Sequence, residues 1–316
     1  MRTDAEQKDV VIIGGGPAGL SAALMLGRAR KQVLLCDGGS PRNSAAEGIH
    51  GFVTRDGTPP QEFRRIAREQ LAPYGVDILL DTRVTAVERL ASGFRVVLAG
   101  GRAVECRRVL LATGMIDELP DLPGYRELWG RSIFQCPYCH GWEIRDRPWG
   151  LLATGAPALD FALFLTGWSR DLVVFTQGLL EVPPEQRQRL ERAGVRVEER
   201  KILRLLPGTG HGAHGAHLEA VELEDGTRVA REVLFAHPHQ RQTELVQRLG
   251  VALDEQGFVR INEQMETSVP GVHAAGDLTT RFQAASMAAG AGTMAAAMMN
   301  HALNMENAAA GLWPEG

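Results

Sequence analysis

A glycine-rich turn after the first apolar run constrains the fold of this chain more than any other feature. Residues 9–13 read DVVII, a run of β-branched side chains that predicts a buried strand of a parallel sheet. The turn that follows has the spacing G-x-G-x-x-G, with Gly14, Gly16 and Gly19. Between a strand and a helix, such glycines permit a tight turn, close approach of a pyrophosphate and close helix–strand packing.

The segments after this turn complete a dinucleotide-binding pattern. Residues 20–28 continue as a helix, and residues 32–36 predict a second strand that ends at Asp37, about twenty residues after the glycines. Asp37 is placed to accept hydrogen bonds from a ribose. A glycine triplet alone is weak evidence, but strand, turn, helix, strand and acid in this order are specific. The sequence therefore predicts an α/β fold that opens with a Rossmann-type dinucleotide site.

A second feature, Cys136-Pro137-Tyr138-Cys139-His140, lies in the middle of the chain. Two cysteines separated by two residues can close a disulfide ring and reopen it, which makes a two-electron redox centre if the first thiolate is activated. Pro137 favours the first turn of a helix, where N–H groups and the helix dipole lower the pKa of a cysteine. The pair also fits half of a zinc site, but the other cysteines, at positions 36 and 106, stand apart from each other. We therefore favour a redox centre.

Composition and charge narrow the class of protein. The chain has 316 residues and a net charge of −4, so nothing indicates nucleic acid or a membrane surface as a partner. Four cysteines in a chain of this length do not form a disulfide framework and suit a reducing, cytoplasmic setting. The polar N-terminal residues do not resemble a signal peptide. The most apolar run, residues 284–299, is rich in Ala, Gly and Met and predicts a buried helix rather than a membrane span.

Three further segments are candidates for the first site. The loop over residues 38–60 carries Arg42, Asn43 and His50, and long loops in compact domains are usually functional. A buried strand over 109–112 ends at Thr113-Gly114, and a strand over 271–275 ends at Gly276-Asp277. A helix of small residues begins near Gln283 and Ala284, and its small side chains would let the backbone approach a flat cofactor closely.

The segment after the cysteines repeats the opening pattern in eroded form. Residues 150–152 and 172–175 predict strands, and residues 158–165 predict the helix between them. Of the glycine triplet only Gly155 remains, and Thr176-Gln177-Gly178 stands where an acid or an arginine cluster would follow the second strand. We expect a second Rossmann-like domain whose nucleotide site is degenerate.

Histidines at positions 211, 214 and 217 recur in a Gly/Ala segment. Metal binding is conceivable, but no cysteine or acidic spacing accompanies them, so we expect a flexible hairpin tip and no metal site.

Four motifs of this chain together resemble those of the low-molecular-weight thioredoxin reductases. They are the opening glycine turn, the Cys-x-x-Cys pair, the Thr113-Gly114 turn and the Gly276-Asp277 pair. The resemblance covers the whole chain in order, and it implies FAD bound by a domain made of residues 1–115 and 245–316. An inserted domain over 116–244 would have the NAD(P)H-type fold and carry the Cys-x-x-Cys pair. The two domains would rotate against each other about hinges over 114–124 and near residue 242. The implied architecture is two Rossmann-like three-layer α/β domains, the first split by the second, in a homodimer.

The family also implies a role for each matching residue. Cys139 would lie against the flavin, Cys136 would exchange with the substrate sulfur, and His140 would move the proton. The residues that the resemblance assigns to FAD binding are Gly14, Gly16, Pro17, Ala18, Gly19, Asp37, Arg42, Asn43, His50, Thr113, Gly114, Gly276, Asp277, Gln283 and Ala284.

Two departures from the family pattern bear on function. His140 replaces an aspartate after the second cysteine, and a histidine can shuttle the same proton with a pKa nearer neutrality. The family's glycine motif and arginines for NADPH are absent from the inserted domain, so NADPH affinity should be poor. Cys-Pro-Tyr-Cys-His-Gly also resembles dithiol oxidases that pass electrons to oxygen, and ferredoxin-fed thioredoxin reductases share the eroded nucleotide site.

The leading hypothesis is an FAD enzyme that moves electron pairs between flavin and the Cys136–Cys139 disulfide. Its partner would be a thioredoxin-like protein or a small dithiol or disulfide, with ferredoxin or O2 as a further redox partner. Alternatives are a dithiol oxidase, a conventional NADPH-dependent reductase, a non-catalytic flavin redox sensor, and a dehydrogenase without disulfide chemistry. Thiol–disulfide exchange is reversible, so the cysteines do not set its direction.

Overall fold

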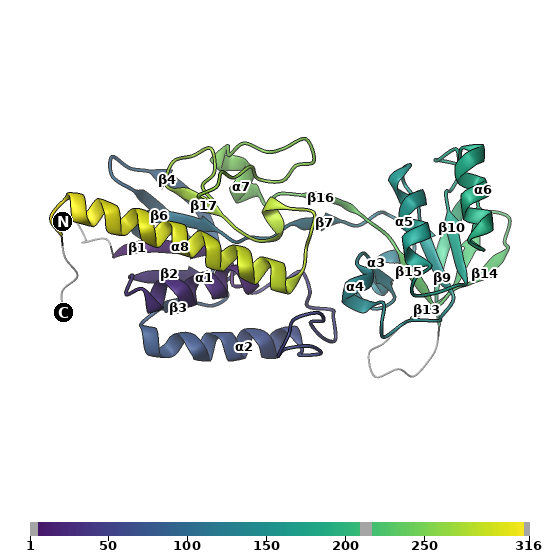
Figure 1. Ribbon diagram of the computed structural model, residues 1–316, viewed down its shortest axis with the longest axis horizontal. Coiled ribbons are helices and arrows are strands. Elements are labelled where there is room, and N and C mark those ends of the chain that lie inside the picture. The colour runs from purple at the N-terminus through teal and green to yellow at the C-terminus, as the bar shows by residue number, and fades with distance from the viewer. Residues whose placement is uncertain (1–5, 209–216, 313–316) are drawn as a thin grey trace. The chain divides into compact units, whose positions relative to one another are not determined.

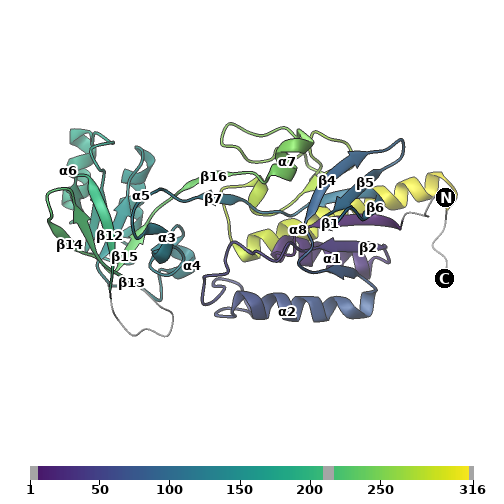
Figure 2. The same ribbon diagram turned by 180° about the vertical axis from the view of Figure 1, so that it is seen from behind.

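A computed structural model describes residues 6–208 and 217–312 of the chain. The chain forms two compact α/β units (Figures 1 and 2). Unit 1 contains Met1–Ser44, Phe52–Ile116 and Gln240–Gly316, and unit 2 contains Ala45–Gly51 and Asp117–His239. The short stretch Ala45–Gly51, which lies between two segments of unit 1 in the sequence, groups with unit 2.

Unit 1 is built on a sheet with the strand order β3-β2-β1-β6-β5-β4, in which β17 also pairs with β6. Strands β3, β2, β1, β6 and β17 are parallel, whereas β4 and β5 form an antiparallel hairpin against β6. The strands are β1 (Gln7–Ile13), β2 (Val33–Cys36), β3 (Asp77–Leu79), β4 (Val84–Arg89), β5 (Phe94–Leu98), β6 (Ala103–Leu111) and β17 (Val272–Ala274). The helices are α1 (Pro17–Arg28), α2 (Pro60–Leu71), α7 (Glu244–Leu249) and α8 (Ala285–Ala309), with 3-10 turns η1 (Ala72–Tyr74) and η2 (Asp277–Thr279).

Alternate side chains of the central strands enter two cores on opposite faces of this sheet. Val10 and Ile12 of β1 pack with α1, α2 and α8, while Val11 and Ile13 pack with the β4–β5 hairpin and α7. Figure 1 shows α8 running alongside α1. The two helices pack closely because Gly292 lacks a side chain, and a Cβ there would lie 2.0 Å from the carbonyl oxygen of Ala18. This arrangement fixes the start of α1 beneath α8.

Unit 2 contains a parallel sheet with the order β11-β10-β9-β15-β8 and an antiparallel sheet with the order β12-β13-β14. Its helices are α3 (Tyr125–Leu128), α4 (Pro137–His140), α5 (Pro157–Leu165) and α6 (Pro184–Arg192). Its strands are β8 (Ile133–Phe134), β9 (Trp149–Leu152), β10 (Leu172–Phe175), β11 (Arg196–Glu198), β12 (Ile202–Gly208), β13 (His217–Leu223), β14 (Arg228–Ala230) and β15 (Val233–Phe235).

The parallel sheet of unit 2 is covered on both faces. Trp149 and Val174 face a core formed with α5 and α6, whereas Val173 and Phe175 face a core formed with the β12–β14 sheet and α3. The chain passes between the units along β7 (Ile116–Glu118) and β16 (His239–Arg241), which pair with each other. These strands fall near both hinges expected from the family resemblance.

The long C-terminal helix differs in one respect from its sequence-based prediction. Residues such as Ala288, Ala295 and Met299 are buried, but Met287 and Met294 are 56% and 50% exposed. The helix is therefore buried along one face only, because it lies on the outside of the sheet layer. No helix within residues 6–208 and 217–312 is long and apolar enough to cross a membrane. His211 and His214 of the sequence analysis lie outside the described residues.

Candidate functional site

The Cys-x-x-Cys pair begins a short helix in unit 2, directly after β8. Cys136 has extended backbone angles and caps α4, with Pro137 at the first helical position, as its fixed φ favours. The Cys139 thiol donates to the Cys136 sulfur over 2.7 Å, and the Cys139 N–H contacts the Cys136 carbonyl oxygen at 3.2 Å. The two sulfurs are therefore placed to form a disulfide with little movement of the chain.

The local contacts activate the first cysteine. The hydrogen bond from the Cys139 thiol lowers the pKa of Cys136 to about 7, assisted by the backbone N–H groups of Cys139 and Tyr138 and opposed by burial. Burial raises the pKa of Cys36 to about 11 and that of Cys106 to about 12. Of the cysteines at positions 36, 106 and 136, only Cys136 has a pKa low enough for a substantial thiolate fraction at neutral pH.

His140 ends the same helix and stacks on Phe134, with ring centroids 4.2 Å apart. Burial, followed by the nearby charge of His50, lowers the pKa of His140 to about 4, and the Cys136 backbone opposes this shift only in part. Neither ring nitrogen makes a well-formed hydrogen bond within the described residues. The pKa therefore differs from the near-neutral value expected from the sequence, and at pH 7 His140 is neutral and a weaker base than a free imidazole.

His50 belongs to the stretch that groups with the cysteine-bearing unit, although the resemblance implies a cofactor contact for it. Its Nδ1 atom lies 3.7 Å from a carboxylate oxygen of Glu143, three residues after His140. Unit 2 therefore brings Cys136, Cys139, His140 and His50 together. Sequence spacing gave no indication of this placement, because His50 is far from the cysteines along the chain.

The fingerprint glycines of unit 1 form a close-packed turn with one open position. A Cβ on Gly14 would lie 2.1 Å from the Ala112 carbonyl oxygen, and a Cβ on Gly19 would lie 1.9 Å from the Gly14 carbonyl oxygen. Nothing lies within 4 Å of the same position on Gly16. Gly16 also caps α1 without a side-chain hydrogen bond, so the first-turn N–H groups after Pro17 face open space, as a pyrophosphate requires.

The turns at the ends of β6 and β17 lie next to this glycine turn. A Cβ on Gly14 would lie 3.2 Å from the Thr113 nitrogen, and one on Gly276 would lie 3.0 Å from Ala18. The Thr113 hydroxyl is buried without a hydrogen-bond partner in the described residues. Gly114 and Gly276 have φ angles of 64° and 94°, which favour glycine. An open glycine, uncapped N–H groups and an orphaned hydroxyl in one place fit the phosphate-bearing part of FAD.

A buried ion pair holds the acid at the end of the second strand. Asp37 is 6% exposed and contacts Arg64 of α2, with Nη2 and Oδ2 2.5 Å apart. Its other carboxylate oxygen accepts a hydrogen bond from the Gly39 N–H at 3.0 Å. The sequence analysis did not include Arg64. The sequence does contain a signal for Arg64. Arg64 lies four residues after Pro60 and next to Phe63, so helical periodicity places it beside the buried face of α2.

Residues from the long loop and from the C-terminal segment meet in unit 1. Arg42 Nη1 lies 2.6 Å from the Gln283 side-chain oxygen and 3.3 Å from an Asp277 carboxylate oxygen. Gln283 in turn exchanges side-chain hydrogen bonds with Gln240, which sequence reasoning missed. Ala284 caps α8, whereas Asn43 is exposed in the loop. The structure thus assembles Arg42, Asp277 and Gln283 as one polar group.

Two residues lie at the carboxyl edge of the unit 2 sheet, where the sequence predicts a degenerate nucleotide site. Thr176, which follows β10, is fully buried, and its hydroxyl has no hydrogen-bond partner in the described residues. Arg200, just beyond β11, is held by Glu198 and Asp225 at 2.6 and 2.8 Å.

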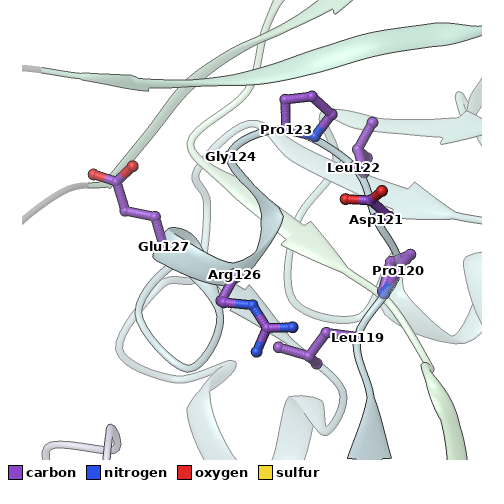
Figure 3. A pocket seen from close by; sticks show the side chains of 8 residues that line it. All are labelled: Leu119, Pro120, Asp121, Leu122, Pro123, Gly124, Arg126 and Glu127. Atoms are coloured by element: carbon purple, nitrogen blue, oxygen red, sulfur yellow. The ribbon is translucent and has the colours of Figure 1, made fainter.

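A cavity of about 640 Å³ lies elsewhere in unit 2, at the start of the inserted segment. Figure 3 shows the loop from Leu119 to Pro123 on one side and α3 on the other, with Arg126 directed toward Leu119 and Glu127 directed away. The lining contains none of the expected site residues. No cluster of metal-ligating side chains occurs within residues 6–208 and 217–312.

Comparison with known proteins places the chain in a family. The family model of the pyridine nucleotide-disulphide oxidoreductases matches residues 8–292. The thioredoxin reductase aclD of Aspergillus oryzae is 34% identical over 301 residues, covering 91% of this chain and 94% of that protein. The chain belongs to the pyridine nucleotide-disulphide oxidoreductases, and within them it is similar to the thioredoxin reductases.

Solved structures support the same assignment. The crystal structure of HlmI superimposes with a TM-score of 0.89 at 38% identity, covering 98% of this chain and 96% of that chain. An oxidoreductase from Agrobacterium tumefaciens superimposes with a TM-score of 0.86 at 37% identity, covering 95% and 99%. The resemblance and the fold class predicted from the sequence are confirmed, and the protein is an FAD-dependent disulfide oxidoreductase.

Proposed function

We propose that this enzyme exchanges an electron pair between its Cys136–Cys139 couple and the sulfur atoms of a thioredoxin-like protein or a small molecule, and that NADPH is a poor electron donor. The observation that carries the proposal is the 2.7 Å contact between the two sulfurs at the start of α4, together with a Cys136 pKa lowered to about 7. A low pKa in a Cys-x-x-Cys turn is the mark of an exchange centre.

The residues of unit 2 suit each step of exchange. In the reductive direction the Cys136 thiolate attacks a substrate disulfide, forms a mixed disulfide and releases one substrate thiolate. Cys139, already in contact with Cys136, loses its proton and attacks the mixed disulfide, which releases the second thiolate and closes the protein disulfide. His140 lies beside this turn as a neutral side chain, and the leaving substrate thiolate can take up that proton. FAD, when bound, supplies or takes up the electron pair of the couple.

The side chains of unit 2 at the expected nucleotide site support poor use of NADPH. Selection of a 2′-phosphate depends on charge-assisted hydrogen bonds, and Arg200 is already engaged by two acids. Thr176 and Gln177 stand where basic side chains would follow β10. These features support an electron donor or acceptor other than NADPH, with ferredoxin and O2 as the candidates.

Substitution of Cys139 by Ser tests the exchange function. Cys139→Ser should retain FAD, because the glycine turn and its neighbours lie in unit 1, and it should lose turnover with both dithiols and disulfides. Cys106→Ala, which removes a buried thiol of raised pKa, is the matched control and should keep turnover. Turnover by Cys139→Ser at a rate close to the parent enzyme would show that the Cys-x-x-Cys pair is not the exchange centre.

A further inference from the structure

Exposed aromatic rings surround the redox turn of unit 2. Tyr138, between the two cysteines, is 71% exposed, and Phe164 of α5 is 42% exposed. The Tyr138 ring lies 5.8 Å from Phe164 and 5.5 Å from Trp168, and Phe164 lies 5.1 Å from Trp168. Trp142, two residues after His140, is 68% exposed. We call Tyr138, Trp142, Phe164 and Trp168 the aromatic platform.

The platform is fixed to the turn that carries the cysteines. A Cβ on Gly141 would lie 2.8 Å from a carbon of the Trp168 ring, so the absence of a side chain lets Trp168 pack on the backbone next to His140. Arg145 stacks its guanidinium 4.0 Å from the centre of the Trp142 ring and donates to the Trp142 carbonyl oxygen. Both contacts hold aromatic rings in set positions beside the redox pair.

Trp168 packs against the core formed with α5 and α6, but a contribution to the core does not account for the exposed rings of Tyr138, Trp142 and Phe164. The core of unit 2 uses other aromatic residues, among them Trp149, Phe175 and Phe235, which are fully buried. Clustered aromatic side chains that remain exposed next to reactive groups usually mark a binding surface. Tyr138, Phe164 and Trp142 present flat faces or edges on which a planar group can stack.

The extent of the platform favours a small ligand over a protein. A fully buried aromatic side chain removes about 150–250 Å² from water, so these partly exposed rings offer roughly 400 Å² at most. A stable protein interface buries about 800 Å² on each partner. The platform alone is therefore too small to hold a protein or a second copy of this chain, but it can cover one face of a ring system.

We infer that the aromatic platform binds a compact disulfide or dithiol that carries a planar unsaturated ring close to its sulfur atoms. The inference rests on the proposed exchange function, and it names the substrate class for the same site. Stacking on the platform places the ligand sulfur at Cys136, because Tyr138 joins the platform to the cysteine pair. The Cys136 thiolate then breaks the ligand S–S bond, and Cys139 completes the two-electron exchange as described above.

The test compares an aromatic with an aliphatic disulfide in single-turnover reactions. The enzyme with FAD bound is reduced by dithiothreitol without oxygen, desalted, and mixed with 4,4′-dithiodipyridine or bis(2-hydroxyethyl) disulfide. The variants are Phe164→Ala and Trp142→Ala, and Leu203→Ala of β12, 51% exposed, is the matched control. The two probes differ in intrinsic reactivity, and this difference cancels when the rate of each variant is divided by the rate of the parent enzyme with the same probe.

Loss of one stacked ring is worth about 0.5–1.5 kcal/mol, so the second-order rate with the aromatic probe should fall by a factor of about 2.3 to 12 in each platform variant. The rate with the aliphatic probe, and both rates in Leu203→Ala, should change less than twofold. Equal losses with both probes, or no loss with either, would overturn the inference. Failure of the reduced parent enzyme to react with either disulfide would overturn the proposed function itself, and the inference with it.

Discussion

Removal of the Cys139 thiol should raise the pKa of Cys136. The hydrogen bond from Cys139 is the largest cause of the lowered pKa of about 7, and burial acts in the opposite direction. In Cys139→Ala this bond is lost while the burial remains, so the pKa should return to about 9. At pH 7 the thiolate fraction of Cys136 would fall from about one half to about one hundredth.

The expected rate change is smaller than the change in thiolate fraction. A thiolate of higher pKa is more nucleophilic, with a Brønsted coefficient of about 0.45. A rise of about two units in the pKa of Cys136 therefore increases the intrinsic rate of its thiolate about eightfold, which offsets part of the loss. The net decrease in the alkylation rate at pH 7 is therefore about sixfold. The midpoint of the pH–rate profile, which depends only on the pKa, gives the clearer readout.

The assay measures alkylation of the reduced protein by iodoacetamide between about pH 5 and pH 10, with the Cys136 peptide quantified by mass spectrometry. Cys36 and Cys106 are internal controls, since burial raises their pKa values to about 11 and about 12. Cys106→Ala should leave the Cys136 profile unchanged. A midpoint that stays near pH 7 in Cys139→Ala would refute the assignment of the low pKa to the cysteine pair.

Three further predictions concern other parts of the structure. Arg64→Met leaves the buried Asp37 carboxylate without its partner, so it should destabilise unit 1 by about 3 kcal/mol in urea unfolding and weaken FAD retention, whereas Arg65→Met, on the exposed face of the same helix, should do neither. The pKa of His140 is lowered in the folded protein, so its contribution to stability is present above about pH 6.5 and is lost as the pH falls toward about 4. His140→Phe should therefore lose less of its thermal midpoint between pH 7 and pH 5 than the parent protein does, and an equal loss would contradict the lowered pKa. The exposed Met294 of α8 suits a partner surface, so light scattering should give the mass of a homodimer and Met294→Lys should shift it toward the monomer.

The parts of the structure that sequence reasoning predicted well are those determined by local chain geometry. The fingerprint turn is one case, because a Cβ on Gly19 would lie 1.9 Å from the carbonyl oxygen of Gly14, five residues earlier, and this leaves no room for a side chain. The helix predicted over residues 20–28 is another, since it follows directly from the fingerprint turn, and α1 runs over Pro17–Arg28 with its proline at the first turn. Such features need no knowledge of distant contacts.

The parts that were not predicted depend on contacts between distant segments. Arg42 meets Gln283 across 241 positions of sequence, and Asp37 meets Arg64 across 27, so no spacing pattern identifies either pair. The lowered pKa of His140 depends on burial against Phe134 and on the approach of His50 from another segment. The sequence identifies the residue types of the site but not the electrostatic environment that fixes their protonation.

Anaerobic titration of the purified protein, followed by flavin absorbance, tests the central claim most directly. The account predicts that a dithiol bleaches the flavin rapidly through Cys136 and Cys139, that NADPH and NADH do so slowly at best, and that Cys139→Ser is not bleached by the dithiol. Readmitted oxygen should restore the absorbance within a turnover time if the enzyme is a dithiol oxidase. Rapid stoichiometric bleaching by NADPH would contradict the account and identify a conventional NADPH-dependent reductase.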